Sequence, residues 1–283
     1  MALTTPDLSG STAFITGTTR GIGKRLALAL ADCGCNIVST GKTTDDDDTD
    51  LAGTIEQTAR EVRERGVESL ALELNLRDED RVEAVVEESI DHFGEVDIVI
   101  NNASAIQLAN VADVPANRFD LLTDVNVRGT HLVAHAFADH LAELDEAWLL
   151  SNSPPVTTDR SPGKAPYAWS KLGMSFITLS LAEELAGTGV GCNTFWPVTA
   201  IDTRATRYFG LGTEDDWRSP EIVSDAVCQI LARDPSECTG NSFYDEELLR
   251  EAGVTEFSAY NLTEGDPAPM SARMFDSSFQ REP

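Results

Sequence analysis

Apolar and polar positions alternate between two periodicities from near the N-terminus onward. Short apolar runs typical of buried strands occupy residues 12–16, 36–40, 69–74, 96–100, 147–150, 190–196 and 242–244. Between them lie segments with apolar residues at helical spacing, at 22–33, 51–65, 81–93, 118–144, 165–185 and 220–232. Strands that alternate with helices predict a parallel sheet joined by right-handed crossovers. We therefore expect a doubly wound α/β fold of about seven strands, with helices on both faces.

No linker or internal repeat interrupts this alternation, so we expect residues 1–283 to form a single domain. Two segments depart from the pattern. The aspartate run at 45–48 follows the second predicted strand, and a solvated surface explains it more simply than cation binding. From about residue 254 the chain is rich in Gly, Pro and Ser, which predicts an irregular tail that runs over the surface.

The net charge bears on the salt concentration in which the protein is expected to work. The sequence has 48 acidic residues against 21 lysines and arginines, a formal net charge of −27. Such self-repulsion destabilises a compact state, but molar salt shortens the Debye length to about 3 Å and screens it. The composition therefore indicates a halophilic organism with a salt-filled cytoplasm, and an ordinary acidic enzyme is the alternative. So acidic a surface also argues against a nucleic-acid partner.

Other bulk features exclude several classes. The sequence has no run of about 18 apolar residues, and its start lacks a basic segment followed by an apolar one. We therefore expect no membrane span, no secretory signal and a cytoplasmic location. Cys33 and Cys35 are separated by one residue, which is not a metal or redox spacing, and we expect free thiols.

A glycine-rich turn follows the first predicted strand, in the order Gly17-x3-Gly21-x-Gly23. Glycine allows backbone N–H groups to approach phosphate oxygens, and the N-terminus of the following helix adds partial positive charge. The spacing differs from the common dinucleotide pattern, and such a turn can serve only to relieve backbone strain. Its position between a strand and a helix favours dinucleotide binding and a Rossmann-type fold.

Asparagines occupy two further positions of interest. Asn101 and Asn102 end the fourth predicted strand, at the sheet edge where ligands of open α/β sheets bind, although asparagine also commonly ends strands. Asn126 lies inside the long helical segment 118–144. Because asparagine is unfavourable in helix interiors, we expect it to have a polar task or to mark a local kink.

Tyr167 and Lys171 are four residues apart at the start of a predicted helix. Residues at this spacing share one helix face, so the phenol and the ammonium group can reach the same ligand. A free tyrosine has a pKa near 10, and a nearby ammonium group lowers that pKa by favouring the phenolate. The pair is also common by chance, and a solvated helix face is the alternative.

Taken in order, these motifs and Pro197 after a strand resemble the short-chain dehydrogenase/reductase family. The resemblance implies that Tyr167 is the general acid–base and that Lys171 holds the nicotinamide ribose and lowers the tyrosine pKa. It implies that Asn126 anchors a water that relays protons to Lys171. It also implies a homodimer or homotetramer that acts on a small-molecule carbonyl or alcohol. The dinucleotide site it implies consists of Gly17, Thr19, Arg20, Gly21, Ile22, Gly23, Lys42, Asn75, Asn102, Ala103, Ser104, Tyr167, Lys171, Pro197 and Thr199.

More narrowly, the chain resembles the hydroxysteroid dehydrogenase-like protein 2 group. The shared stretches lie within residues 14–24, 101–106, 126–130, 153–155, 196–201 and 239–241. Members from higher organisms append a sterol-carrier-like domain, which we expect this chain to lack. The group's name does not by itself imply activity on steroids.

One departure from the wider family concerns the reaction itself. The usual catalytic serine lies thirteen residues before the tyrosine, and this position is Pro154. Loss of one donor of this kind typically lowers turnover by about 10²–10³-fold. The adjacent Ser153 could replace the missing hydroxyl, which would make it the fourth catalytic candidate. Two hypotheses follow: an oxidoreductase with a modified site, or a dinucleotide-binding sensor or scaffold with little turnover.

Different residues of the sequence bear on the choice of cofactor and on the substrate. The second strand ends without the acidic residue that usually binds the ribose of NAD, whereas Arg20 and Lys42 could hold a 2′-phosphate. NADP is therefore expected, with NAD as the alternative because aspartates follow closely. The segment 198–217 is expected to form a lid over the site. Its Arg204, Arg207 and aromatic residues are compatible with an acidic or acyl-chain substrate, and a solvated loop is the alternative. His131 and His135 have ligand spacing on a helix, but nothing completes a metal site, so no metal is expected.

Overall fold

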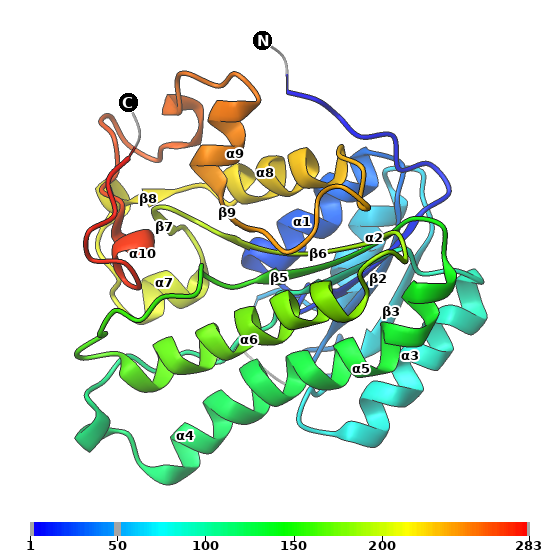
Figure 1. The fold of residues 1–283 in the computed structure, drawn as a ribbon, viewed down its shortest axis with the longest axis horizontal. Coiled ribbons are helices and arrows are strands. Elements are labelled where there is room, and N and C mark those ends of the chain that lie inside the picture. Colours follow the sequence, from blue (N-terminus) through cyan, green and yellow to red (C-terminus); the bar gives the residue numbers. More distant parts are fainter. Residues whose placement is uncertain (1–2, 48–51, 282–283) are drawn as a thin grey trace.

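A parallel sheet forms the centre of the protein, which is described here by a computed structural model covering residues 3–47 and 52–281. Within that part of the chain the sheet has seven strands in the order β3-β2-β1-β4-β5-β6-β9 (Figure 1). It consists of β1 (Thr12–Thr16), β2 (Asn36–Gly41), β3 (Ser69–Glu73), β4 (Ile98–Asn101), β5 (Ala147–Asn152), β6 (Val190–Trp196) and β9 (Ser242–Tyr244). All of its pairings are parallel, which confirms the doubly wound Rossmann-type fold.

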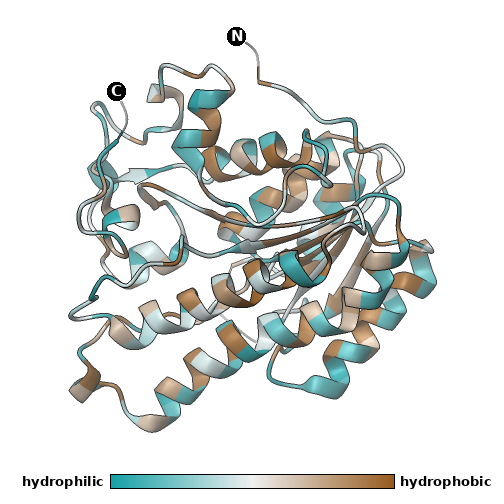
Figure 2. Cartoon of the chain, in the orientation of Figure 1, coloured by the Kyte–Doolittle hydropathy of each residue, from teal (hydrophilic) through white to brown (hydrophobic). Residues whose placement is uncertain are grey.

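Helices cover both faces of the sheet. One apolar core lies against α1 (Gly21–Asp32), α2 (Ile55–Arg63), α8 (Glu221–Leu231) and α9 (Asp245–Glu251). The other lies against α3 (Glu79–Phe93), α5 (Gly129–Glu143) and α6 (Ala165–Glu184). Alternate residues of β1 enter opposite cores, with Ile15 on the first side and Phe14 on the second, as the pleat requires. The strands are accordingly hydrophobic along their length, and polar positions gather on the outer helices (Figure 2).

The helical segment 118–144 is not the single helix that its pattern predicts. The chain forms α4 (Ala116–Leu122), then a π-helical turn at Thr123–Arg128, and then α5. Asn126 lies in the π turn and is completely buried. A π turn inserts extra backbone into a helix and redirects its side chains, and it occurs most often at functional sites. The expected polar task and the local irregularity therefore coincide at this residue.

The tail after residue 254 is largely irregular and exposed, but several buried residues anchor it. It contains a 3₁₀ turn at Ser258–Tyr260 and the short helix α10 (Met270–Arg273), and Phe275 and Phe279 are buried beside Trp196 and Tyr244. Composition suggested an exposed tail because Gly, Pro and Ser weaken its periodicity, but a few widely spaced aromatic residues are enough to anchor it. The tail thus covers the end of β6 and β9.

An ionic network that is buried at Arg218 and Glu246 fixes this tail in place. Arg218 lies on β8 (Trp217–Arg218), which pairs with β7 (Ala200–Ile201) in a small sheet. Its guanidinium bonds Glu246 of α9 at 2.5 Å and Asp266 of the tail at 2.5 Å. Arg281 bonds the same two carboxylates, at 2.9 and 2.6 Å. Each carboxylate therefore bridges two arginines, and the tail is tied to α9 and β8.

The histidine pair and the described part of the aspartate run lie on the surface. His131 and His135 stack with ring centroids 5.9 Å apart, and the described residues contain no cluster of three or more side chains suited to a metal. Asp45 bonds Arg60 and Asp47 accepts from the Thr44 backbone, whereas position 48 of the aspartate run lies outside the described residues. The five cysteines are free thiols. In the described part of the chain no helix is both long and apolar enough to cross a membrane.

Candidate active site

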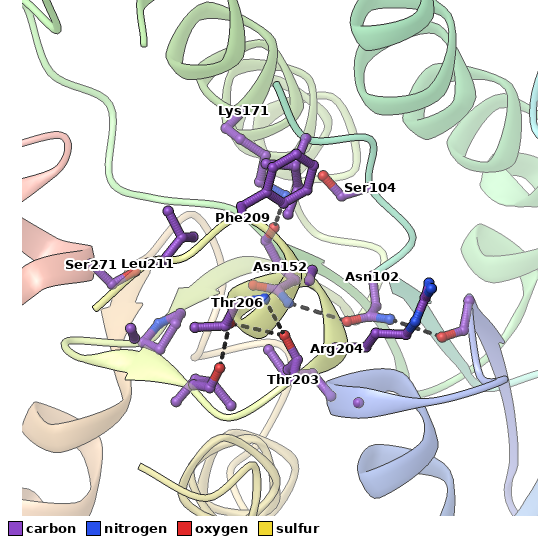
Figure 3. Close-up of a pocket in the computed structure, with 18 of the residues that line it drawn as sticks. Asn102, Ser104, Asn152, Lys171, Thr203, Arg204, Thr206, Phe209, Leu211 and Ser271 are labelled. Atoms are coloured by element: carbon purple, nitrogen blue, oxygen red, sulfur yellow. Dashed lines mark hydrogen bonds between the residues drawn. The ribbon is translucent and has the colours of Figure 1, made fainter. Parts of the chain in front are cut away.

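A cavity of about 570 Å³ opens at the carboxyl ends of the central strands (Figure 3). Its wall combines the glycine turn, the segment after β4, the start of α6, the residues after β6 and parts of α7 (Arg204–Tyr208) and α10. This volume lies within the range of small-molecule and cofactor sites. Its place between β1 and β4, where the strand order reverses, is the ligand-binding position of open α/β sheets.

The glycine turn is shaped so that a side chain at any of its glycines would be strained or would collide. Gly17 and Gly21 have φ of +76° and +58°, in the left-handed region. A Cβ on Gly17 would lie 3.0 Å from Ala103, and one on Gly23 would collide with the Gly17 carbonyl oxygen. The helix α1 starts here with no side-chain cap on its first turn. Its free N–H groups and dipole therefore face a cradle that fits a pyrophosphate.

The asparagine after β4 holds this turn against its neighbours. The Asn102 amide nitrogen donates to the Thr16 carbonyl at 3.0 Å and to the Gly17 carbonyl at 3.3 Å. Its oxygen accepts from the Asn152 side chain at 3.1 Å, and the Thr16 hydroxyl accepts from the backbone N–H groups of Asn102 and Ala103. These bonds join β1, β4 and β5 at the cavity floor, so the strand-ending asparagine also builds the site.

Asn126 clamps the segment that follows β4. Its oxygen accepts from the Ala105 N–H at 2.7 Å, and its amide nitrogen donates to the Ala105 carbonyl at 3.0 Å and to the Ser170 hydroxyl at 2.9 Å. These contacts link the π turn, the cavity wall and α6. Asn126 therefore acts here by positioning the chain, and its place in a proton relay stays a prediction.

Tyr167 and Lys171 project from the start of α6 into the cavity wall, with 6% and 1% of their surfaces exposed. The Lys171 ammonium nitrogen donates to the Asn152 carbonyl at 2.5 Å and lies 5.3 Å from the centre of the Trp196 ring. Burial lowers the pKa of Lys171 to about 7. The site therefore holds an amine that can exchange its proton near neutrality.

Burial raises the pKa of Tyr167, and a hydrogen bond with the Ser104 hydroxyl partly opposes this rise. The phenol is thus neutral in the protein alone, because desolvation disfavours the phenolate. The lower pKa that Lys171 and an oxidised nicotinamide would give Tyr167 stays a prediction for the complex.

Ser153 is not one of the residues that line this cavity. It is fully buried, and its hydroxyl has no hydrogen-bond partner among the described residues. The neighbouring Pro154 uses its carbonyl to accept from the Ser175 hydroxyl at 2.5 Å. The hydroxyl that the cavity does place beside the Tyr167 phenol belongs to Ser104, which the sequence suggested only as a cofactor contact.

The structure brings together most of the predicted site. The cavity wall includes Gly17, Arg20, Gly21, Ile22, Gly23, Asn102, Ala103, Ser104, Tyr167, Lys171 and Pro197. Buried behind the wall are Thr19, Asn126, Ser153 and Thr199. Lys42 is exposed beyond the end of β2, and Asn75 is half-buried with its side chain accepting from the Arg77 N–H.

Several wall residues were not anticipated. Asn152 ends β5 at the edge where ligands bind, so its position in the sequence could have indicated it. Its buried side-chain oxygen has no hydrogen-bond partner among the described residues, and the residue itself lines the cavity. Met270, Ser271 and Met274 of the tail also line the cavity, and nothing in their local pattern signals that contact.

Comparison with known proteins agrees with this geometry. The family model described as short chain dehydrogenase matches residues 11–211. The chain belongs to this family. It is 40% identical over 266 residues to hydroxysteroid dehydrogenase-like protein 2 of Rattus norvegicus, covering 93% of this chain and 50% of the relative. The human protein of that name is also 40% identical, with 92% of this chain and 62% of the relative covered. The chain thus spans only half to two-thirds of these relatives.

Solved structures show the same architecture. A crystal structure of a short chain dehydrogenase from Mycobacterium thermoresistibile matches with a TM-score of 0.85 and 37% identity, covering 92% of this chain and 94% of that one. A short chain dehydrogenase from Mycobacterium paratuberculosis bound to NAD matches with a TM-score of 0.72, covering 84% of this chain and 97% of that one. At 23% identity the second match supports the fold alone.

Proposed function

We propose that this protein is an NADP-dependent oxidoreductase that interconverts a carbonyl compound and its secondary alcohol. The observation that carries the proposal is the burial of Tyr167 and Lys171 in the wall of the same cavity as the glycine turn. A bound nicotinamide supplies or accepts the hydride. Tyr167 gives the proton to the carbonyl oxygen, or takes it from the alcohol, and the glycine turn holds the phosphates.

The surrounding residues support a path for that proton. Lys171 has a pKa of about 7, because it is buried, so it can exchange a proton at neutral pH. Asn126, which fixes the chain at Ala105, keeps the Ser104 wall of the cavity in place. The Ser104 hydroxyl, which lies near enough to lower the pKa of the Tyr167 phenol, can hold the substrate oxygen where the family serine is replaced by Pro154.

The preference for NADP rests on Arg20. Its guanidinium bonds the carbonyl of Ala52 at 3.1 Å, the carbonyl of Gly53 at 3.1 Å and the Thr43 hydroxyl at 3.3 Å, beside the loop that follows β2. The adenosine ribose of a dinucleotide lies next to this loop in Rossmann-type sites. The end of β2 at Gly41 offers no carboxylate to a 2′-hydroxyl. NAD is the alternative cofactor.

The apolar side chains of the cavity wall support an apolar substrate. They include aliphatic and thioether groups: Ile106, Leu108, Leu211, Met270 and Met274. A small carbonyl or alcohol with an apolar body matches these walls, since burial of apolar surface contributes about 25 cal/mol per Å². The proposal includes a homodimer or homotetramer in the salt-filled cytoplasm of a halophile, with no nucleic-acid partner.

A second function, a sensor or scaffold that binds the dinucleotide with little turnover, is favoured by one observation. Pro154 replaces the catalytic serine, and the adjacent Ser153 hydroxyl is buried outside the cavity wall. Removal of one oxyanion donor alone lowers turnover by about 10²–10³-fold. The two functions share the cofactor site and differ only in rate.

Turnover measurements separate the two functions. A panel of carbonyl compounds with apolar substituents is assayed with NADPH in molar KCl, with the wild type and the Tyr167→Phe variant. We expect NADPH oxidation by the wild type and loss of at least about 10²-fold in rate for the variant, since the phenol moves the proton. NADPH affinity should change less than about threefold. Tight NADPH binding without turnover on any compound would support the sensor, and an active Tyr167→Phe variant would remove Tyr167 as the acid–base.

A further inference from the structure

Arg204 is an unusual cation in a chain of net charge −27. Among the described residues, nearly every arginine has a carboxylate, carbonyl or aromatic partner, and the exceptions are Arg118, Arg160 and Arg204. All three are exposed, but Arg118 and Arg160 lie outside the cavity wall, whereas Arg204 is part of that wall. A guanidinium that lines a cavity without a carboxylate partner is available to an anion from outside the chain.

The place of Arg204 in the fold identifies the part of the cavity it faces. It is the first residue of α7, and the preceding Thr203 caps that helix by accepting from the Thr206 N–H. Thr203 packs against the glycine turn so closely that a Cβ on Gly21 would lie 3.3 Å from its methyl group. Arg204 and Gly21 line both the main cavity and an adjacent outer groove. Figure 3 shows Thr203 and Arg204 at the same edge of the cavity as Asn102.

The glycine turn's own arginine leaves this edge open. The Arg20 guanidinium is held by Ala52, Gly53 and Thr43 on the side of the β2 loop. Arg204 nevertheless lies near enough to lower the pKa of Arg20, after the larger effect of burial. Two arginines that repel each other across one turn are stabilised together by a ligand with more than one negative charge.

Many of the other side chains in the cavity wall are apolar, among them Ile106, Leu108 and Met274. Arg207, the other arginine of α7, is engaged with Asp202 and Glu214. The part of the wall built for an anion is the glycine turn, and Arg204 adjoins it through Thr203 and Gly21. The anion that Arg204 can face is therefore the one held by the glycine turn.

We propose that Arg204 binds the pyrophosphate of the dinucleotide from the α7 side, opposite the backbone N–H groups of the glycine turn, so that α7 closes over the cofactor. This inference rests on the proposed dinucleotide-binding function. It assigns the phosphate contact to a residue of the lid segment, where the sequence suggested a substrate contact. In this arrangement Arg20 contacts the adenosine ribose, and Arg204 contacts the phosphates that NAD and NADP have in common.

The test measures dissociation constants by titration calorimetry at a fixed KCl concentration, without turnover. Wild type, Arg204→Ala and Arg118→Ala are each titrated with NADPH, NADH, ADP-ribose and adenosine. Arg118→Ala is the matched control, because it removes one equally unpaired arginine from an exposed site outside the cavity. We expect Arg204→Ala to weaken the three diphosphate ligands by similar factors, about 10-fold or more for one charge-assisted bond, and to leave adenosine unchanged.

The other outcomes exclude the assignment. A loss confined to NADPH would place Arg204 at the 2′-phosphate, and equal losses in both variants would show only an effect of overall charge. Unchanged cofactor binding with a higher KM for the carbonyl compound would place Arg204 at the substrate. A wild type that binds none of the three diphosphate ligands would overturn the dinucleotide function itself, which distinguishes that failure from the failure of this inference.

Discussion

At the scale of single residues, the side chains proposed for proton transfer and the side chain proposed for cofactor choice lie in different parts of the site. Tyr167 and Lys171 are buried and meet the cavity from one helix, while Ser104 approaches the phenol from the segment after β4. Arg20 lies on the other side of the glycine turn, bonded to the loop after β2. Substitutions at these two groups should therefore change different measurements: rate in the first case, and choice of cofactor in the second.

The Arg20→Ala variant tests the proposed choice of NADP. Without the guanidinium a 2′-phosphate loses a charge-assisted bond of about 1.5–3 kcal/mol, so NADPH binding should weaken about 10-fold or more and NADH binding much less. Titration of both cofactors measures the ratio of the two losses. Arg20→Lys is the control, because it keeps the charge and removes the planar fork, and it should lie between wild type and Arg20→Ala. Equal losses for NADPH and NADH would rule out the 2′-phosphate contact.

At the scale of elements, short irregular segments do as much for the site as the regular helices. The π turn presents Asn126 to Ala105, and α9 presents Asp245 to the chain after β6. The Asp245 carboxylate accepts from the Val198 N–H at 2.8 Å and from the Glu246 N–H at 2.7 Å, and it is 2% exposed. Because Pro197 lines the cavity, Asp245 fixes the backbone next to the site.

Asp245 gives this element a predictable dependence on pH. Burial, and secondarily the neighbouring Glu246, raises the pKa of Asp245 to about 7, although two backbone N–H groups and Arg218 oppose the rise. Below about pH 4 the carboxyl is protonated in both the folded and unfolded states. Between about pH 4 and 7 only the unfolded state loses the proton, so the free energy of unfolding falls as pH rises, by up to about 4 kcal/mol in total.

In the Asp245→Asn variant the free energy of unfolding should not fall in this way as pH rises. The amide oxygen can still accept from Val198, and no charge is buried, so its Tm relative to wild type should rise from pH 5 to pH 8. Thermal unfolding followed by circular dichroism in molar KCl measures the difference. Asp139→Asn is the control, because Asp139 is exposed on α5 and its variant should show no such trend. The same Tm difference at both pH values would contradict a buried, protonated Asp245.

At the scale of the whole molecule, the large negative net charge has the greatest effect on folding stability. Most ion pairs of the described residues have at least one exposed partner, and in some both are exposed, as for Arg60 with Asp45 at 53% and 46%; exposed pairs contribute little. They cannot offset 48 acidic residues against 21 lysines and arginines. Folding stability should therefore depend on the screening of repulsion between carboxylates over the entire surface.

We expect the protein to lose helical circular dichroism or subunit assembly when KCl is lowered from molar to about 0.05 M. The Debye length then rises from about 3 Å to more than 10 Å, so the carboxylates repel one another over longer distances. A domain has a free energy of unfolding of only about 5–15 kcal/mol, and added repulsion of a few tenths of a kcal/mol per acidic residue exceeds it. KCl should restore the fold, and NADPH should protect it by binding only the folded state. Sorbitol of equal osmolality is the control without screening. A chain that stays folded and assembled in dilute buffer would show that its acidity is not a salt adaptation.

The sequence by itself determined the features that depend on local periodicity and on single-residue geometry. The alternation of strands and helices predicted the parallel sheet, because buried strands and amphipathic helices have different periods. Gly17, Gly21 and Gly23 predicted the phosphate cradle, since positive φ and close backbone contact require glycine there. The spacing of Tyr167 and Lys171 placed both on one helix face.

Only the tertiary structure decided the features that depend on contacts between distant segments. The break of residues 118–144 into two helices follows from the bonds of Asn126 to Ala105 and Ser170, which no helical period encodes. The tail folds back because Arg218 and Arg281 share two carboxylates far apart in sequence. The burial of Ser153 outside the cavity wall and the unpaired state of Arg204 likewise depend on which elements pack around them, and packing is a property of the folded chain.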